Sequence, residues 1–103
     1  MIVHAVMFYI KNQETIHQKK EALQTVKQQL MSLKQHINCL KDCHVGINEK
    51  ESSRSADLLL MTYFHSWKDL DIYRDHVYHQ QVLADIKPFI EKSIVVDYTH
   101  SNT

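Results

Sequence analysis

The first ten residues carry apolar side chains at both odd and even positions. Residues 2–10 read IVHAVMFYI, with Val6 and Phe8 on one alternating face and Val3 and Met7 on the other. Side chains alternate between the two faces of a strand, so a strand that is apolar on both faces must be covered on both. The pattern therefore predicts a β-strand with two buried faces.

The hydrophobic period changes at Thr15. Apolar residues then recur at steps of three, four and seven while Lys, Gln and Glu fill the gaps, which predicts one amphipathic helix of about twenty residues. Its apolar stripe is expected to comprise Ile16, Leu23, Val26, Leu30, Leu33 and Ile37.

Alternation returns in residues 39–48 and again in residues 57–64, and predicts two further strands. The first of these is expected to place Cys39, Cys43, Val45 and Ile47 on one side and Leu40, Asp42, His44 and Gly46 on the other. A glycine within a strand usually marks a β-bulge or a close backbone approach, and we expect one of these at Gly46. The polar residues 49–56 predict a hairpin loop between the two strands.

Two helices and a final strand are expected after residue 65. Ser66 is placed as an N-cap, with Asp69 positioned to complete a capping box. The first helix is expected to present Trp67, Leu70 and Tyr73 on one face, and the second to present His79, Leu83, Ile86 and Ile90. Residues 94–98 predict a short last strand, and residues 100–103 a frayed tail.

The order of elements predicts one domain over residues 1–99 in the α+β class: a ferredoxin-like β-α-β-β-α-β fold with a four-stranded antiparallel sheet. In this fold the helices cover one face of the sheet only, yet the strands are apolar on both faces. The bare face therefore requires a partner, and a second copy of the chain is the simplest one. We expect a homodimer through the sheet face, a dimeric α/β barrel, that buries on the order of 800 Å² or more per subunit.

The amino-acid composition argues against several classes of function. The chain of 103 residues has one glycine, whereas dinucleotide-binding fingerprints, P-loops and nucleophile elbows each need at least two. The formal net charge is zero, which argues against a nucleic-acid or anionic membrane partner. The absence of a long apolar run and of a disulfide framework leads us to expect a soluble, cytoplasmic protein in which Cys39 and Cys43 are reduced.

The pair Tyr73 and His79 is the main candidate for chemistry. Six residues of unbroken helix would leave the two side chains roughly 120° apart, so a break near Asp75 and His76 is needed to bring them together. Asp75 could then cap the second helix. The even-numbered face of the first strand would bring His4 to the same space. The expected pocket between sheet and helices is lined by Tyr73, His79, His4, His76, Val6, Phe8 and Leu83.

The run Tyr73-Arg74-Asp75-His76-Val77-Tyr78-His79, with the closing Val96-Asp97-Tyr98, resembles the stress-responsive dimeric α/β barrel (Dabb) family. The resemblance covers nearly the whole chain, although the family usually has His-Pro-x-His and Val77 replaces that proline here. It implies the barrel fold. Similarity to a polyketide cyclase of the family implies that His79 would act as the base, Tyr73 as the hydrogen-bond donor, and His4 as a residue that shapes the pocket.

Two functions therefore follow as hypotheses. The first is a dimeric module whose pocket binds a small hydrophobic or aromatic molecule. The alternative is a cofactor-independent lyase or cyclase that enolises a poly-carbonyl substrate through His79 and Tyr73. A haem-degrading monooxygenase, which shares the barrel fold, ranks below both. His76 and His79 lie three residues apart, but no acidic or cysteine ligand is placed to complete a metal site, so we expect neither a metal nor a cofactor.

Overall fold

A computed structural model describes residues 1–101. The elements follow in the order β1 (Ile2–Ile10), α1 (Ile16–Met31), α2 (Leu33–His36), β2 (Asp42–Ile47), β3 (Leu58–Phe64), α3 (Trp67–Asp75), α4 (Val77–Ile86), the 3₁₀ turn η1 (Lys87–Phe89) and β4 (Ile90–Thr99). The predicted ferredoxin-like β-α-β-β-α-β fold is confirmed.

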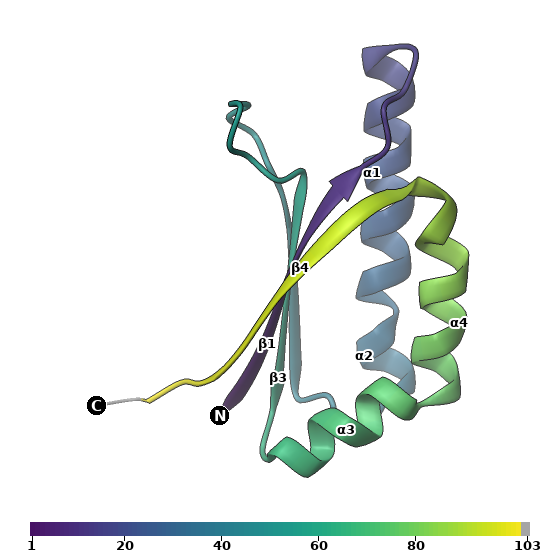
Figure 1. The fold of residues 1–103 in the computed structure, drawn as a ribbon. Helices are drawn as coiled ribbons and strands as arrows, with labels where there is room; N and C mark the ends of the chain where they lie inside the picture. Colours follow the sequence, from purple (N-terminus) through teal and green to yellow (C-terminus); the bar gives the residue numbers. More distant parts are fainter. Residues whose placement is uncertain (102–103) are drawn as a thin grey trace.

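One antiparallel sheet, in the strand order β2-β3-β1-β4, forms the base of the molecule. The two most apolar strands, β1 and β3, lie side by side in its centre. The helices α1, α2, α3 and α4 lie on one side of this sheet, and no other element of residues 1–101 covers its second face, which we call the bare face (Figure 1). None of the helices in residues 1–101 is long and apolar enough to cross a membrane.

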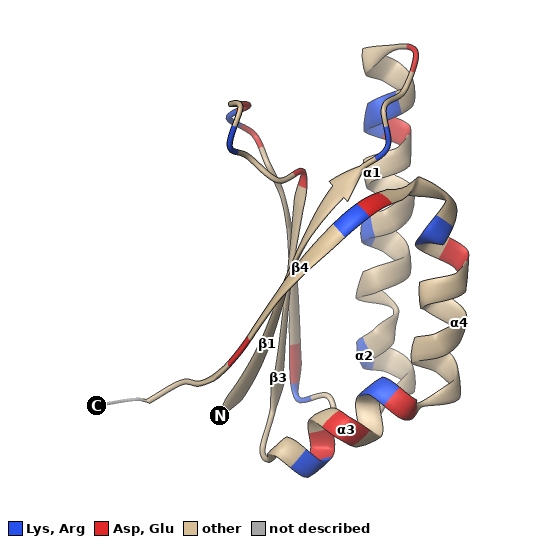
Figure 2. Ribbon diagram, in the orientation of Figure 1, with Lys and Arg blue, Asp and Glu red and all other residues tan. Residues whose placement is uncertain are grey.

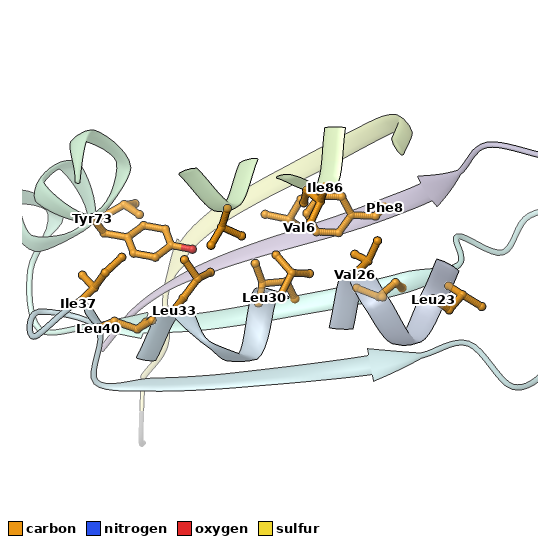
Figure 3. Packing of buried hydrophobic residues seen from close by; sticks show 14 of the residues in the cluster. Val6, Phe8, Leu23, Val26, Leu30, Leu33, Ile37, Leu40, Tyr73 and Ile86 are labelled. Atoms are coloured by element: carbon orange, nitrogen blue, oxygen red, sulfur yellow. The ribbon is translucent and has the colours of Figure 1, made fainter. Parts of the chain in front are cut away.

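The core fills the space between the sheet and the helices (Figure 3). The even-numbered residues of β1 are all buried there, as the alternation predicted. From the predicted helical stripe, the core receives Leu23, Val26, Leu30, Leu33 and Ile37. Ile16 was expected on the same stripe but is exposed, because it is the first residue of α1 and lies outside the core.

The predicted single helix after Thr15 is interrupted at Ser32. The Ser32 hydroxyl donates a hydrogen bond of 2.6 Å to the carbonyl of Gln29, which is the local back-bonding by which serine competes with the helical pattern. Thr15 caps the start of α1 by accepting from the Gln18 N–H at 3.0 Å. The short α2 then carries Leu33 into the core.

Two predictions for the second strand were wrong. Leu40 was placed on the polar side, but β2 starts only at Asp42, and Leu40 lies in the preceding turn, where it is free to point into the core. Gly46 sits in a regular register with β3 and a Cβ there would meet no atom within 4 Å, so neither a bulge nor a close approach explains it. The one register shift of β1 lies between Tyr9 and Ile10, against β4.

The last strand is longer than predicted. It runs over Ile90–Thr99, although residues 91–93 are polar, because pairing with β1 satisfies the backbone while an edge strand leaves its side chains in solvent. His100 was expected to be the first residue of a frayed tail, yet its N–H donates to the carbonyl of Met1 at 2.8 Å. The remainder of the expected tail includes residues 102 and 103, which lie outside the described residues.

The centre of the bare face is apolar, whereas its edges carry Asp42 and His44 of β2 and Lys92 of β4. Neither β1 nor β3 contains a Lys, Arg, Asp or Glu, and Figure 2 shows both strands free of charged residues. The cross-strand register places the large exposed apolar side chains of this face in adjacent positions: Met7, Leu59, Ile94, Val96 and Tyr98. We call these five residues the bare-face patch.

Candidate functional site

The helical conformation is interrupted at His76, between α3 and α4. This residue has φ −64° and ψ 136°, an extended conformation that ends α3 at Asp75 and starts α4 at Val77. Its own Nδ1 accepts a hydrogen bond of 3.0 Å from the Tyr78 N–H. The break was predicted correctly, but the cap is His76 rather than Asp75.

A partly enclosed cavity of about 170 Å³ lies between the sheet and the helices. It is lined by His4, Val6, Phe8, Leu30, Leu33, Leu60, Tyr73, Arg74, His79, Val82, Leu83, Ser93 and Val95. Six of the seven residues proposed from the sequence for the pocket are among these. The seventh, His76, is not, since its imidazole serves the helix cap.

Tyr73 reaches from α3 into this space and is fully buried (Figure 3). Its ring lies 4.4 Å from that of His79 and 5.0 Å from that of Phe64, measured between centroids. Its hydroxyl is the one buried side-chain polar atom in residues 1–101 without a hydrogen-bond partner. Burial raises the pKa of the Tyr73 phenol, so the hydroxyl keeps its proton and can donate it.

A hydrogen bond to the backbone near the end of α3 holds His79 in one tautomer. Its Nδ1 lies 3.1 Å from the carbonyl oxygen of Arg74, and because a carbonyl can only accept, Nδ1 carries the hydrogen. In the neutral ring the lone pair is therefore on Nε2. Burial lowers the pKa of His79 and outweighs the hydrogen bond to Arg74, which favours this neutral form. His79 is thus arranged as an acceptor or a base.

Asp97, His4 and Arg74 form a cluster of polar residues beside the cavity. Asp97 on β4 pairs through one oxygen with Nδ1 of His4, and through the other with Nη2 of Arg74 at 2.8 Å. Burial opposes ionisation of Asp97, but its hydrogen bonds with His4 and Arg74 outweigh this and lower its pKa. The carboxylate therefore ties β1, α3 and β4 together beside the Tyr73 ring, which lies 6.2 Å from the His4 ring.

Asp97 and Arg74 were not proposed as site residues from the sequence. Both belong to the motifs that carry the family resemblance, and the β1–β4 register sets His4 opposite Asp97. An assumed antiparallel pairing of the first and last strands could therefore have found Asp97. No group of three or more His, Cys, Asp and Glu that could hold a metal ion occurs within residues 1–101. Cys39 and Cys43 are both free.

The comparisons with known proteins place this chain in a family. Residues 2–100 match the family described as the stress responsive A/B barrel domain, and the chain belongs to that family. No curated protein matches the sequence significantly.

Several solved structures share the fold at low sequence identity. A dimeric protein of unknown function with a ferredoxin-like fold from Bacteroides fragilis has a TM-score of 0.83 and 20% identity, with 96% of this chain and 95% of that chain covered. A dimeric ferredoxin-like protein of unknown function from Thermobifida fusca gives 0.80 and 21%, covering 96% and 90%. The hydroxynitrile lyase from Passiflora edulis gives 0.81 and 16%, covering 99% and 94%. These likenesses show the fold.

Proposed function

We propose that this chain forms a homodimer that binds a small hydrophobic or aromatic molecule in the cavity between its sheet and its helices. The observation that carries the proposal is the cavity itself, where eight apolar side chains surround the Tyr73 and His79 pair. A concave, mainly apolar site with a few polar groups is the usual form of a small-molecule site. Leu83 and Val95 at its border are exposed, which supports access from solvent.

The bare-face patch supports the dimer. Monomeric proteins rarely leave a large contiguous apolar surface in contact with water. Two structures of similar fold are described as dimeric. We further propose a cytoplasmic location, because free thiols persist in a reducing compartment.

Toluene is a suitable probe of the cavity. We expect it to perturb amide NMR signals around the cavity in the native protein, and not in the Leu83→Trp variant, where an indole at the border blocks the entrance. Ile72→Trp is the matched control, since Ile72 is exposed on α3 and does not line the cavity. Equal toluene binding by both variants, or no binding by the native protein, would overturn the proposal.

A lyase or cyclase is the second candidate. It is favoured by the position of the neutral His79 ring, whose centroid lies 4.4 Å from that of the protonated Tyr73 phenol. His79 Nε2 would take a proton from the carbon next to a carbonyl group. The electron pair left on that carbon would move to the carbonyl oxygen, which Tyr73 would stabilise by a hydrogen bond. The Passiflora edulis protein of the same fold is described as a lyase.

Hydrogen–deuterium exchange of a small diketone tests this candidate. Acetylacetone in D₂O should exchange its central hydrogens faster with the native protein than with His79→Gln or Tyr73→Phe, by about 10²-fold or more for the base. If acetylacetone exchanges these hydrogens no faster with any of the three proteins than in buffer alone, the enzymatic function is wrong. We do not propose haem degradation, because a tetrapyrrole is several times larger than a cavity of about 170 Å³.

A further inference from the structure

We propose that a hollow beside Gly46 on the bare face receives Ile94 of the partner subunit, so that β2 of each subunit packs against β4 of the other. The proposal rests on the proposed dimer, because it names the contacts through which the two subunits meet. It also accounts for the glycine in β2.

The hollow beside Gly46 is open on the bare face. It has a volume of about 330 Å³, and Met7 and Leu59 of the bare-face patch belong to its lining. A Cβ at Gly46 would meet no atom within 4 Å, and the backbone there does not have the positive φ that favours glycine. Neither space nor backbone conformation within residues 1–101 therefore requires a glycine at this position.

The two edges of the bare face differ in the size and polarity of their side chains. The edge at β4 carries three large apolar side chains that are exposed: Ile94, Val96 and Tyr98. The edge at β2 carries a glycine and two polar residues in the same three rows of the sheet: Gly46, His44 and Asp42. One edge protrudes where the other is hollow or polar, so each edge is complementary to the other and not to itself.

A two-fold axis parallel to the strands brings these complementary edges together. The subunits of a two-fold dimer use the same surface, and sheets that pack face to face keep their strand directions within about 30° of each other. With the strand order β2-β3-β1-β4, an axis between β3 and β1 places β4 on the partner's β2 and each row on the same row of the partner. An axis across the strands would instead place β2 on β2 and β4 on β4.

Small and large side chains match in the arrangement with the axis along the strands. Ile94 meets the hollow beside Gly46 of the partner subunit, because both lie in one row. An engineered cavity of about 150 Å³ in another protein holds the six carbons of benzene, so the hollow has room for the four side-chain carbons of an isoleucine. In the next row, Met61 meets Ala5 of the partner subunit, which has the second smallest side chain in these rows.

The third row supplies a polar contact. There the Tyr98 hydroxyl comes to the Asp42 carboxylate of the partner subunit and can donate a charge-assisted hydrogen bond. The Asp42 carboxylate already has three partners in its own subunit: the Cys43 N–H, His44 and Lys34. A carboxylate has about four lone-pair sites, so it can accept from one further donor.

A nuclear Overhauser effect in the native protein tests the contact directly. Within one subunit, β3 and β1 separate Gly46 from Ile94, and the strand spacing puts the two roughly 14 Å apart, which is too far for this effect. We expect a cross-peak between the Gly46 N–H and the δ1 methyl group of Ile94 in deuterated protein with protonated isoleucine methyl groups. Ile94→Val lacks only that methyl group and should abolish the cross-peak. Ile72→Val is the matched control and should retain it, since Ile72 is exposed on α3.

A change of side-chain size tests the fit. Gly46→Leu fills the hollow and is expected to raise the dimer dissociation constant about tenfold or more, because overpacked interiors are unfavourable. Ile94→Ala in the same chain should restore part of this loss, whereas Ile72→Ala should restore none. Analytical ultracentrifugation measures the constants. Circular dichroism is expected to show that Gly46→Leu is folded, since the position is free of close contacts within its own subunit.

The dimer and its arrangement fail in different ways. A native protein that sediments as a monomer would overturn the proposed dimer together with this inference. A native dimer without the cross-peak would overturn the contact of β2 with β4 and leave the dimer in place. An unchanged dissociation constant in Gly46→Leu, or equal rescue by Ile94→Ala and Ile72→Ala, would show that the hollow does not receive Ile94.

Discussion

Burial of His79 links the site to the pH dependence of stability, and it outweighs the opposing effect of the hydrogen bond to the Arg74 carbonyl on the pKa. Burial is the largest influence on the pKa of His79 and lowers it, and the nearby His4, Arg74 and His76 act in the same direction. The unfolded chain therefore binds a proton at His79 more readily than the folded protein does. By linkage, this contribution to stability is complete above a pH of about 6.5 and is lost as the pH falls through the pKa of the folded state.

We expect the urea midpoint of the native protein to fall between pH 7 and pH 5, and to fall less in His79→Gln. The comparison isolates His79, because the exposed histidines are the same in both proteins. His17→Gln is the control, since His17 is exposed at the start of α1. If the urea midpoint falls equally with pH in the native protein and in His79→Gln, the assignment of this pH dependence to His79 is wrong.

Single residues also show where sequence patterns are informative. The alternation in β1 correctly assigned Val6 and Phe8 to the core, because a strand must turn every second side chain to the same side. Leu40 was misplaced because the exact start of β2 depends on the preceding turn. The Tyr73–His79 contact could be anticipated, whereas the missing partner of the Tyr73 hydroxyl depends on every neighbouring side chain.

The junction of α3 and α4 decides which side chains enter the cavity. An unbroken helix would leave the side chains of Tyr73 and His79 about 120° apart, and the extended backbone of His76 provides the break that lets both line the cavity. Val77 occupies the first position of α4, where proline is favoured, and its side chain is 82% exposed. The residue before a proline prefers the extended region that His76 already adopts.

Val77→Pro is therefore expected to stabilise the protein by about 0.4–1 kcal/mol, because proline restricts the unfolded chain without straining the folded one.

His76→Ala is expected to cost about 1 kcal/mol of stability through loss of the cap to the Tyr78 N–H. Urea unfolding at fixed protein concentration measures both changes. A lower midpoint for Val77→Pro would show that the junction does not tolerate a proline at this position.

The whole molecule has one covered and one bare face of its sheet, and this asymmetry is the reason for the proposed dimer (Figure 1). Val96 lies in the bare-face patch and is 51% exposed. A charge at that position would have to be buried in a sheet-to-sheet interface, which is strongly unfavourable without a partner.

Val96→Glu is expected to sediment as a monomer at micromolar concentration, where we expect the native protein to sediment as a dimer. Ile72→Glu introduces the same charge on the helical side and should leave the dimer intact. A native protein that sediments as a monomer at these concentrations would refute the dimer. A Val96→Glu dimer would show instead that the subunits meet through another surface.

The sequence by itself determined the order and type of the elements, the face of β1 that enters the core, and the break between Tyr73 and His79. These properties follow from local periodicity and capping, which depend on near neighbours along the chain. Only the tertiary structure decided the extent of β4, the pairing of His4 with Asp97, and the isolation of the Tyr73 hydroxyl. These depend on contacts between β1, α3 and β4, which are distant in the sequence and have no local pattern.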